Sequence, residues 1–230
     1  MLNATKMKKT TKLLSTITLM VVVLFSNPSM AQMKETTIKN NSTSNVLLKM
    51  DMRKLWEDHV TWTRNVILCL VDELPGTDQA VKRLLQNQVS IGDAIKPYYG
   101  EDAGKKLTEL LYAHINISAE VIKVAKEGNE TAVGEVNIRW NENANEIAEF
   151  LCKANPNWKL ADMKMMMADH LKLTTDEIMQ RIKKNYDADV LAYDKVHDEI
   201  LKMSDMLSDG IVKQFPEKFT PATSKKLAAE

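Results

Sequence analysis

The chain is poor in the residues that build cross-linked or loop-rich folds. Its 230 residues include two cysteines, seven glycines, six prolines and 6% aromatic residues. Two cysteines exclude a disulfide-dense secreted scaffold and a four-cysteine zinc site. Cys69 and Cys152 both lie in segments of helical periodicity. One disulfide and two separate buried thiols therefore both stay open.

The motifs of several enzyme classes are also missing. The sequence has no P-loop, no Gly-x-Gly-x-x-Gly and no Gly-x-Ser-x-Gly nucleophile elbow. It has no Cys-x-x-Cys-His, and closely spaced Leu and Met residues argue against the wide cavity that a noncovalent haem needs. Asp187-Ala-Asp189 has the form of a nucleotide-sugar motif, but the alternating strands and helices of such enzymes are absent.

The first 31 residues have the pattern of a secretory signal peptide. Four lysines precede the apolar run LLSTITLMVVVLF, and the small residues Ser29 and Ala31 stand at the −3 and −1 positions of a cleavage site. The run is shorter than the ~20 apolar residues of a membrane-spanning helix. We expect an exported protein, periplasmic or secreted, that is cleaved after Ala31 and has no membrane partner afterwards. An uncleaved N-terminal anchor is the alternative.

The remaining chain divides into three segments. Without the four leader lysines, 27 basic residues stand against 31 acidic ones, and a net charge near −4 gives no basis for binding nucleic acid. Residues 32–45 are polar and predict a flexible leader. Residues 46–216 suit one domain without internal repeats, and residues 217–230 predict a frayed tail. The sequence does not indicate an oligomeric state.

Apolar residues recur at helical spacing through most of the domain. The pattern predicts an all-α antiparallel bundle of five long helices and one short helix, because the links between helices are mostly short. The expected long helices are 46–74, 101–127, 131–154, 159–184 and 188–214, and the short one is 77–87. Gly92, Pro97 and Gly100 predict an irregular stretch over 88–100.

Each of the four histidines lies on the apolar stripe of a different predicted helix, near the same height. Neutral imidazole binds Zn, Fe, Cu or Ni. The pattern therefore predicts one transition metal ion with His59, His114 and His170 as ligands and His197 or Asp194 completing the shell.

A metal-free interpretation of the same pattern also stands. Buried histidines that hydrogen-bond other polar groups would only set the register of the helices. Asn143, midway along the 131–154 helix, is a further polar group expected near this height.

The stretch MKMMMADH at 163–170 suggests two other metal sites. Met163 or Met167 could join His170 in a Cu(I) site, although methionines at helical spacing usually form flexible core packing. A di-iron centre needs two Glu-x-x-His motifs, and only Asp194-x-x-His197 comes near that pattern.

Arg64 is unusual because it lies in the apolar run TWTRNVILCLV. A buried arginine needs a carboxylate, here Asp189, Asp194 or Glu146, or else an anionic ligand. A metal-dependent hydrolase would further need an open coordination position and a general base, for which Glu146 and Glu177 are the candidates.

The runs LWEDHVTWTR, YYG, NPNW and DMLSDGIVKQFPEKF, spread over residues 50–219, are similar to a poorly characterised bacterial all-helical family. Its members often carry automatic transferase or kinase names, and the resemblance implies no established activity. The layout of histidines on separate helices also resembles DinB-type metal bundles, without a shared motif. We expect a metal-binding or a metal-free structural bundle rather than an enzyme.

Overall fold

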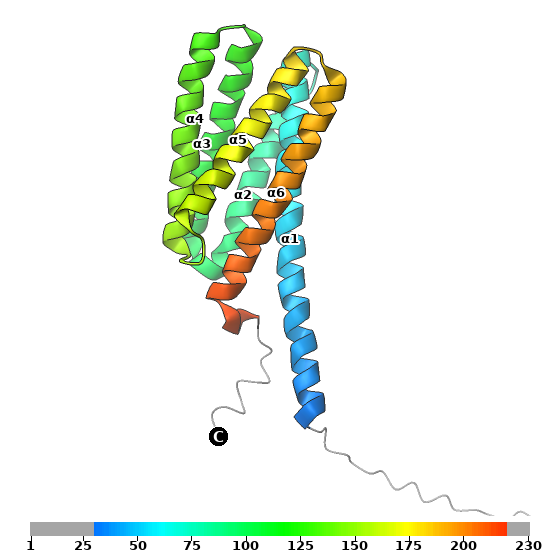
Figure 1. Ribbon diagram of the computed structural model, residues 1–230, viewed down its shortest axis with the longest axis vertical. Helices are drawn as coiled ribbons and strands as arrows, with labels where there is room; N and C mark the ends of the chain where they lie inside the picture. Colours follow the sequence, from blue (N-terminus) through cyan, green and yellow to red (C-terminus); the bar gives the residue numbers. More distant parts are fainter. Residues whose placement is uncertain (1–29, 220–230) are drawn as a thin grey trace, which may run out of the picture.

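The computed structural model describes residues 30–219, and the side chains from residue 44 onward. These residues form six α-helices, a final 3₁₀ turn and no strand (Figure 1), which confirms the predicted all-α bundle. The elements are α1 (Met30–Asp72), α2 (Thr77–Tyr99), α3 (Glu101–Lys126), α4 (Glu130–Ala154), α5 (Leu160–Ile182), α6 (Tyr186–Gln214) and η1 (Pro216–Lys218). The predicted signal peptide, up to residue 29, and residues 220–230 of the tail lie outside the described residues.

Two helices are longer than predicted. α1 begins at Met30, so residues 32–45, expected to be flexible, are helical. The helix expected to be short continues to Tyr99 as α2. Gly92 does not break it, because this glycine lies where α2 and α3 approach closely: a Cβ at Gly92 would stand 2.6 Å from the carbonyl oxygen of Gly104. Pro97 lacks the N–H that would bond to the preceding turn, and α2 ends two residues later, at Tyr99.

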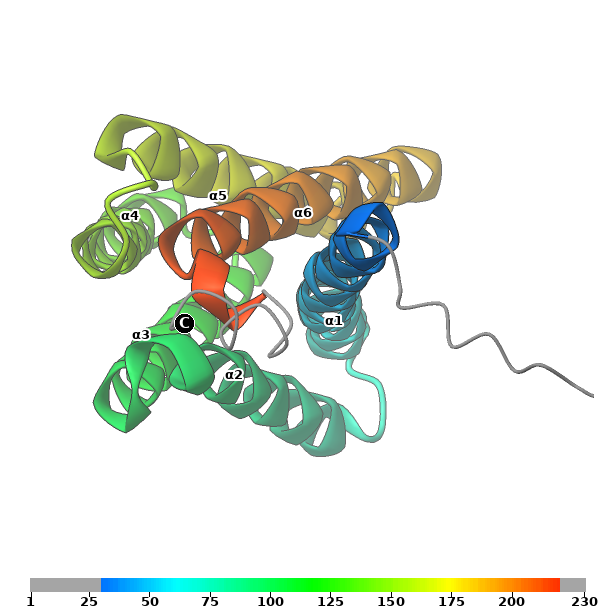
Figure 2. The ribbon, with the colours of Figure 1, turned by 90° about the horizontal axis from the view of Figure 1, so that it is seen from below.

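The six helices form a closed ring. Each packs against its neighbours in chain order, and α6 packs against α1 (Figure 2). The odd-numbered helices α1, α3 and α5 also meet one another in the middle. Consecutive helices run in opposite directions, so these three run in the same direction, and the first turns of α1 extend beyond the others (Figure 1). A shared direction allows corresponding residues of the three helices to lie at one height.

The three hairpins α1–α2, α3–α4 and α5–α6 repeat one burial pattern. A buried histidine lies in the first helix of each hairpin, at intervals of 55 and 56 residues. It is followed at once by a buried aliphatic residue and, eight positions later, by a buried isoleucine. These residues are Val60, Ile115 and Leu171, and Ile67, Ile122 and Ile178.

The second helices repeat as well. Four buried apolar positions recur in each, namely Ala80, Leu84, Ile91 and Ile95 in α2, Val136, Trp140, Ile147 and Leu151 in α4, and Ala192, Val196, Met203 and Leu207 in α6. No repeat is predicted from the sequence, because few residue types are identical at these positions. Burial and spacing show that the domain is a threefold repeat of a helical hairpin.

The close contact between α2 and α3 gives a first prediction. We expect Gly92→Ala to lower the free energy of unfolding by about 1–3 kcal/mol, because the new methyl group overpacks against the backbone of Gly104. Urea unfolding followed by circular dichroism measures the change.

Gly134→Ala in α4 is the matched control. A Cβ at Gly134 meets nothing within 4 Å, so alanine should leave stability unchanged or raise it by up to about 1 kcal/mol. Equal effects of the two substitutions would contradict the close packing of α2 on α3.

Candidate functional site

His59, His114 and His170, hereafter the histidine cluster, meet in the middle of the bundle. Their exposed fractions are 3%, 3% and 4%. The ring of His170 lies between the other two, with centroid distances of 5.8 Å to His59 and 6.1 Å to His114. Trp56 lies edge-on to His59, and Trp140 packs against His114. Three imidazoles from α1, α3 and α5 thus share one apolar enclosure.

Each ring of the cluster contacts a side chain of the next helix through its Nδ1 atom. His59 Nδ1 lies 3.2 Å from Gln88 Nε2 on α2, His114 Nδ1 lies 2.9 Å from Asn143 Oδ1 on α4, and His170 Nδ1 lies 2.9 Å from Glu199 Oε2 on α6. All three pairs span 29 residues. Every helix of the ring therefore contributes one side chain to the site.

These contacts fix the tautomer of two rings. Asn143 Nδ2 donates to the carbonyl oxygen of Leu110, so Asn143 Oδ1 faces His114 and accepts from its Nδ1–H. The carboxylate of Glu199 accepts in the same way from Nδ1–H of His170. In its neutral form each of these two rings carries its lone pair on Nε2, the nitrogen on the far side of the ring from its Nδ1 partner.

The side-chain amide of Gln88 is less completely hydrogen-bonded than that of Asn143. Its Nε2 is near three acceptors, namely His59 Nδ1, the carbonyl oxygen of Leu84 at 2.9 Å and Asn87 Oδ1 at 3.2 Å. An amide has only two N–H groups. Its Oε1 is buried and has no hydrogen-bond partner among the described residues. With this orientation Nδ1 of His59 accepts, whereas the reversed amide would give His59 the tautomer of the other two rings.

Burial keeps two rings of the cluster, His59 and His114, uncharged. Desolvation lowers the pKa of His59 well below its ordinary value of 6.5, and a charge on His170 or His114 would lower it further. Desolvation, followed by the influence of His170, lowers the pKa of His114 to about 3. Both rings are therefore neutral near pH 7, the form in which imidazole binds a metal ion.

The two residues expected to complete a metal shell lie outside the cluster. His197 is partly exposed, and its Nε2 pairs with Glu57 Oε1 at 3.1 Å. Asp194 is exposed. The buried face of α6 includes Ala192, Val196 and Ile200 instead. The predicted stripe was rotated because exposed apolar residues at the start of α6, among them Val190, imitate a core face.

The cluster as it stands does not form a metal site. Among the described residues, no group of three or more His, Cys, Asp or Glu side chains is already arranged to hold a metal ion. For metal–nitrogen distances of about 2.0–2.1 Å, two ring centroids would lie about 5.2–5.5 Å apart. The observed 5.8 and 6.1 Å require each pair of rings to close by roughly half an ångström.

Among the described residues, the two cysteines form no disulfide with each other. Cys69 on α1 and Cys152 on α4 are free thiols. Met163 and Met167 are buried members of the main hydrophobic core. Asn143, by contrast, is the hydrogen-bond partner of a cluster histidine.

Arg64 belongs to a second buried polar group, closer to the end of the bundle. It contacts Glu177 at 3.0 Å and binds both oxygens of Asp189, and Arg181 links Asp189 to Asp72. Of the three carboxylates proposed for Arg64 from the sequence, only Asp189 contacts it, since Asp194 and Glu146 are exposed. Glu177, considered from the sequence only as a base, is its other partner.

Glu177 is in an unfavourable place for a negative charge. It is 1% exposed, and burial, opposed by Arg64 and reinforced by Asp189, raises its pKa to about 7. The group of Arg64, Glu177, Asp189, Arg181 and Asp72 therefore gains or loses a proton near neutral pH.

Comparisons of the chain with models of protein families, with curated protein sequences and with solved structures find no significant match. The resemblance to a bacterial helical family therefore stays a prediction. Within the part of the chain that the structure describes, no helix is long and apolar enough to cross a membrane.

The depressed histidine pKa values predict destabilisation by acid. An unfolded histidine binds a proton below about pH 6.5, whereas folded His114 does so only near pH 3. The stability contributed by the neutral ring is present above pH 6.5 and is lost as the pH falls toward 3, by about 1.4 kcal/mol per pH unit for each histidine. Urea unfolding at a series of pH values measures this slope.

His114→Gln should reduce this slope, because it removes one of the protonating groups, whereas His197→Gln should leave it unchanged. The same slope in the wild-type protein and in His114→Gln would contradict the burial of a neutral ring at this position.

For Glu177 we predict that stability changes with pH in the opposite direction. The folded protein binds its proton up to pH ~7 and the unfolded chain only up to about 4.5, so stability falls as the pH rises through this window. Glu177→Gln removes the effect while keeping an acceptor for Arg64. Relative to wild type, it should gain up to about 3 kcal/mol of unfolding free energy between pH 5 and pH 8. A difference that does not change with pH would contradict this account of Glu177.

Proposed function

We propose that this protein binds one transition metal ion through His59, His114 and His170. The observation that carries the proposal is that three buried imidazoles from three helices converge, each with Nδ1 in contact with a side chain of the next helix. Histidine ligands of metal ions usually have their second nitrogen held in this way, which fixes the orientation of the ring. Three nitrogen donors suit zinc, copper, iron or nickel.

Burial supports a binding role rather than catalysis. None of the described pockets is lined by a cluster histidine, so a substrate would have no direct access to an ion held there. Glu146 is exposed on α4, and Glu177 is paired with Arg64, so neither is free as a base at the cluster. Together with the predicted signal peptide, these features favour an exported metal-binding protein.

A metal-free structural role is the second candidate, and one observation favours it. With the amide of Gln88 as it stands, Nδ1 of His59 accepts and the proton of the neutral ring lies on Nε2, so that nitrogen has no lone pair for a metal ion. The cluster would then be a hydrogen-bonded group that fixes helix register. The two candidates differ in the tautomer of His59 and in whether metal binds.

The proposal predicts stoichiometric binding that depends on three of the four histidines. Titration of the metal-free protein with Zn²⁺ and Co²⁺, followed by calorimetry and by the visible spectrum of Co²⁺, should give one site per chain. His59→Gln, His114→Gln and His170→Gln should each lose at least about 100-fold in affinity, because a ligand is removed.

His197→Gln is the matched control and should bind as the wild-type protein does, since His197 pairs with Glu57 at the surface. Circular dichroism identifies any variant that fails to fold. Absence of saturable binding, or equal losses in His197→Gln and the cluster variants, would refute the metal proposal and favour the structural role.

A further inference from the structure

The side chains that hold the histidine cluster differ in their access to solvent. Gln88 and Asn143 are 0% and 5% exposed, and neither lines a described pocket. Glu199, the partner of His170, lines a groove of about 520 Å³ between α5 and α6. The cluster is therefore connected to the surface through Glu199.

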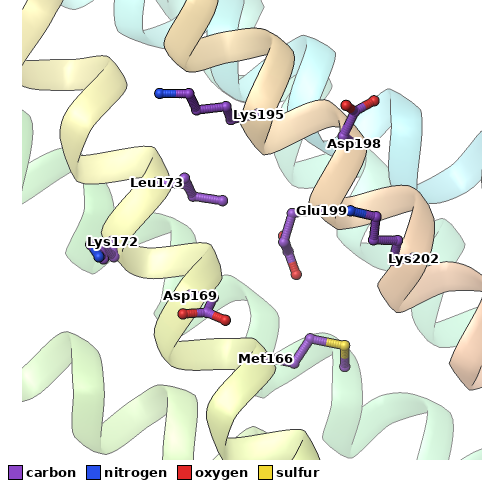
Figure 3. Close-up of a pocket in the computed structure, with 8 residues that line it drawn as sticks. All are labelled: Met166, Asp169, Lys172, Leu173, Lys195, Asp198, Glu199 and Lys202. Carbon is purple, nitrogen blue, oxygen red and sulfur yellow. The ribbon is translucent and has the colours of Figure 1, made fainter.

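One oxygen of Glu199 has a protein partner and the other has none. Oε2 accepts from Nδ1 of His170, whereas Oε1 is buried without a hydrogen-bond partner among the described residues. A buried carboxylate oxygen without a partner is costly. Figure 3 shows this carboxylate pointing into the space between α5 and α6. Because the Glu199 side chain lines the groove and is 12% exposed, a cation in the groove can approach this carboxylate and compensate its charge.

The groove is lined by as many acidic as basic side chains, and the acidic ones can bind a small cation. Asp169, Asp198 and Glu199 are its acidic residues, and Lys172, Lys195 and Lys202 are its basic ones. Lysine offers no lone pair to a metal ion when charged, whereas carboxylates bind one directly. Because Glu199 is the residue that reaches the histidines, a cation attracted to it arrives next to His170.

We propose that this groove is the entry route of the metal ion and that Glu199 Oε1 is its first docking point before transfer to the histidine cluster. The inference rests on the proposed metal binding and adds a path to it. In the bound state Glu199 keeps its hydrogen bond to His170, so the residue positions a ligand as well as guiding the ion.

A substitution that blocks the groove tests the entry route without changing the histidine ligands. Leu173 lines the groove and points toward α6 in Figure 3. Leu173→Trp should fill the groove while leaving the Glu199–His170 contact in place. A blocked route raises the barrier without changing either end state. Zn²⁺ association and release should therefore both slow by the same factor, with unchanged affinity and one site per chain. Stopped-flow fluorescence and competition with a chelating dye measure the rates.

Leu160→Trp adds the same side chain at an exposed position of α5 outside the groove, and it should bind and release at wild-type rates. Glu199→Gln keeps an acceptor for His170 but removes the charge. It should slow association and weaken binding by about 10–100-fold. Glu142→Gln, an exposed charge change on α4, is its control and should change neither.

The outcomes distinguish the two proposals. Wild-type association rates in both Leu173→Trp and Glu199→Gln, with one Zn²⁺ bound, would overturn the route and leave the site intact. Absence of Zn²⁺ binding in the wild-type protein would overturn the site and the route together. Slowed exchange in Leu173→Trp but not in Leu160→Trp, at equal affinity, supports the route.

Discussion

The fold depends on burying three imidazoles at the meeting point of α1, α3 and α5. A buried polar ring is tolerated only when its nitrogens find partners, and each ring here has one on the following helix. The three contacts tie each odd-numbered helix to its successor and thus fix the register of every hairpin. Hydrophobic packing alone would hold these helices together, but it would specify their relative heights less strictly.

The threefold repeat explains why the cluster has this shape, and the departures from the repeat give it its chemistry. In the second hairpin Asn143 accepts a hydrogen bond from His114 and donates one to the carbonyl oxygen of Leu110. In the first hairpin two adjacent residues share these contacts: Asn87 donates to the carbonyl oxygen of Leu55, and Gln88 contacts His59.

The third hairpin uses a carboxylate, Glu199, instead of an amide, and it is this partner that lines a surface groove. The three hairpins are therefore alike in structure, but only the third brings a carboxylate to the histidine cluster. The buried ion group around Arg64 adds a second asymmetry, because Glu177 takes a position that valines occupy in the other two hairpins, at Val66 and Val121.

Much of this architecture could be predicted from helical periodicity. The apolar stripes of α1, α3 and α5 are clear, and they placed His59, His114 and His170 on inward faces. The buried face of α6 was predicted wrongly because Val190 and its neighbour Leu191 are apolar but exposed. The length of α2 was predicted wrongly because Gly92 permits close packing of α2 on α3, whereas a glycine in a sequence is usually taken to end a helix.

Gln88 and Glu199 were missed entirely. The available signal was their common separation of 29 residues from a histidine, which becomes visible only when the three hairpins are aligned. Such an alignment needs the burial pattern, since the residue types at corresponding positions are mostly different.

Nitrogen-15 NMR of the four histidine rings, before and after addition of one equivalent of Zn²⁺, tests the central claim most directly. The account predicts that Nε2 of three histidines shifts strongly on binding and that Nδ1 of His114 and His170 keeps its proton, whereas Nδ1 of His59 gains one as the amide of Gln88 reverses. His197 should stay unchanged as an internal reference. Zn²⁺ that shifts no ring, or only His197, would contradict it.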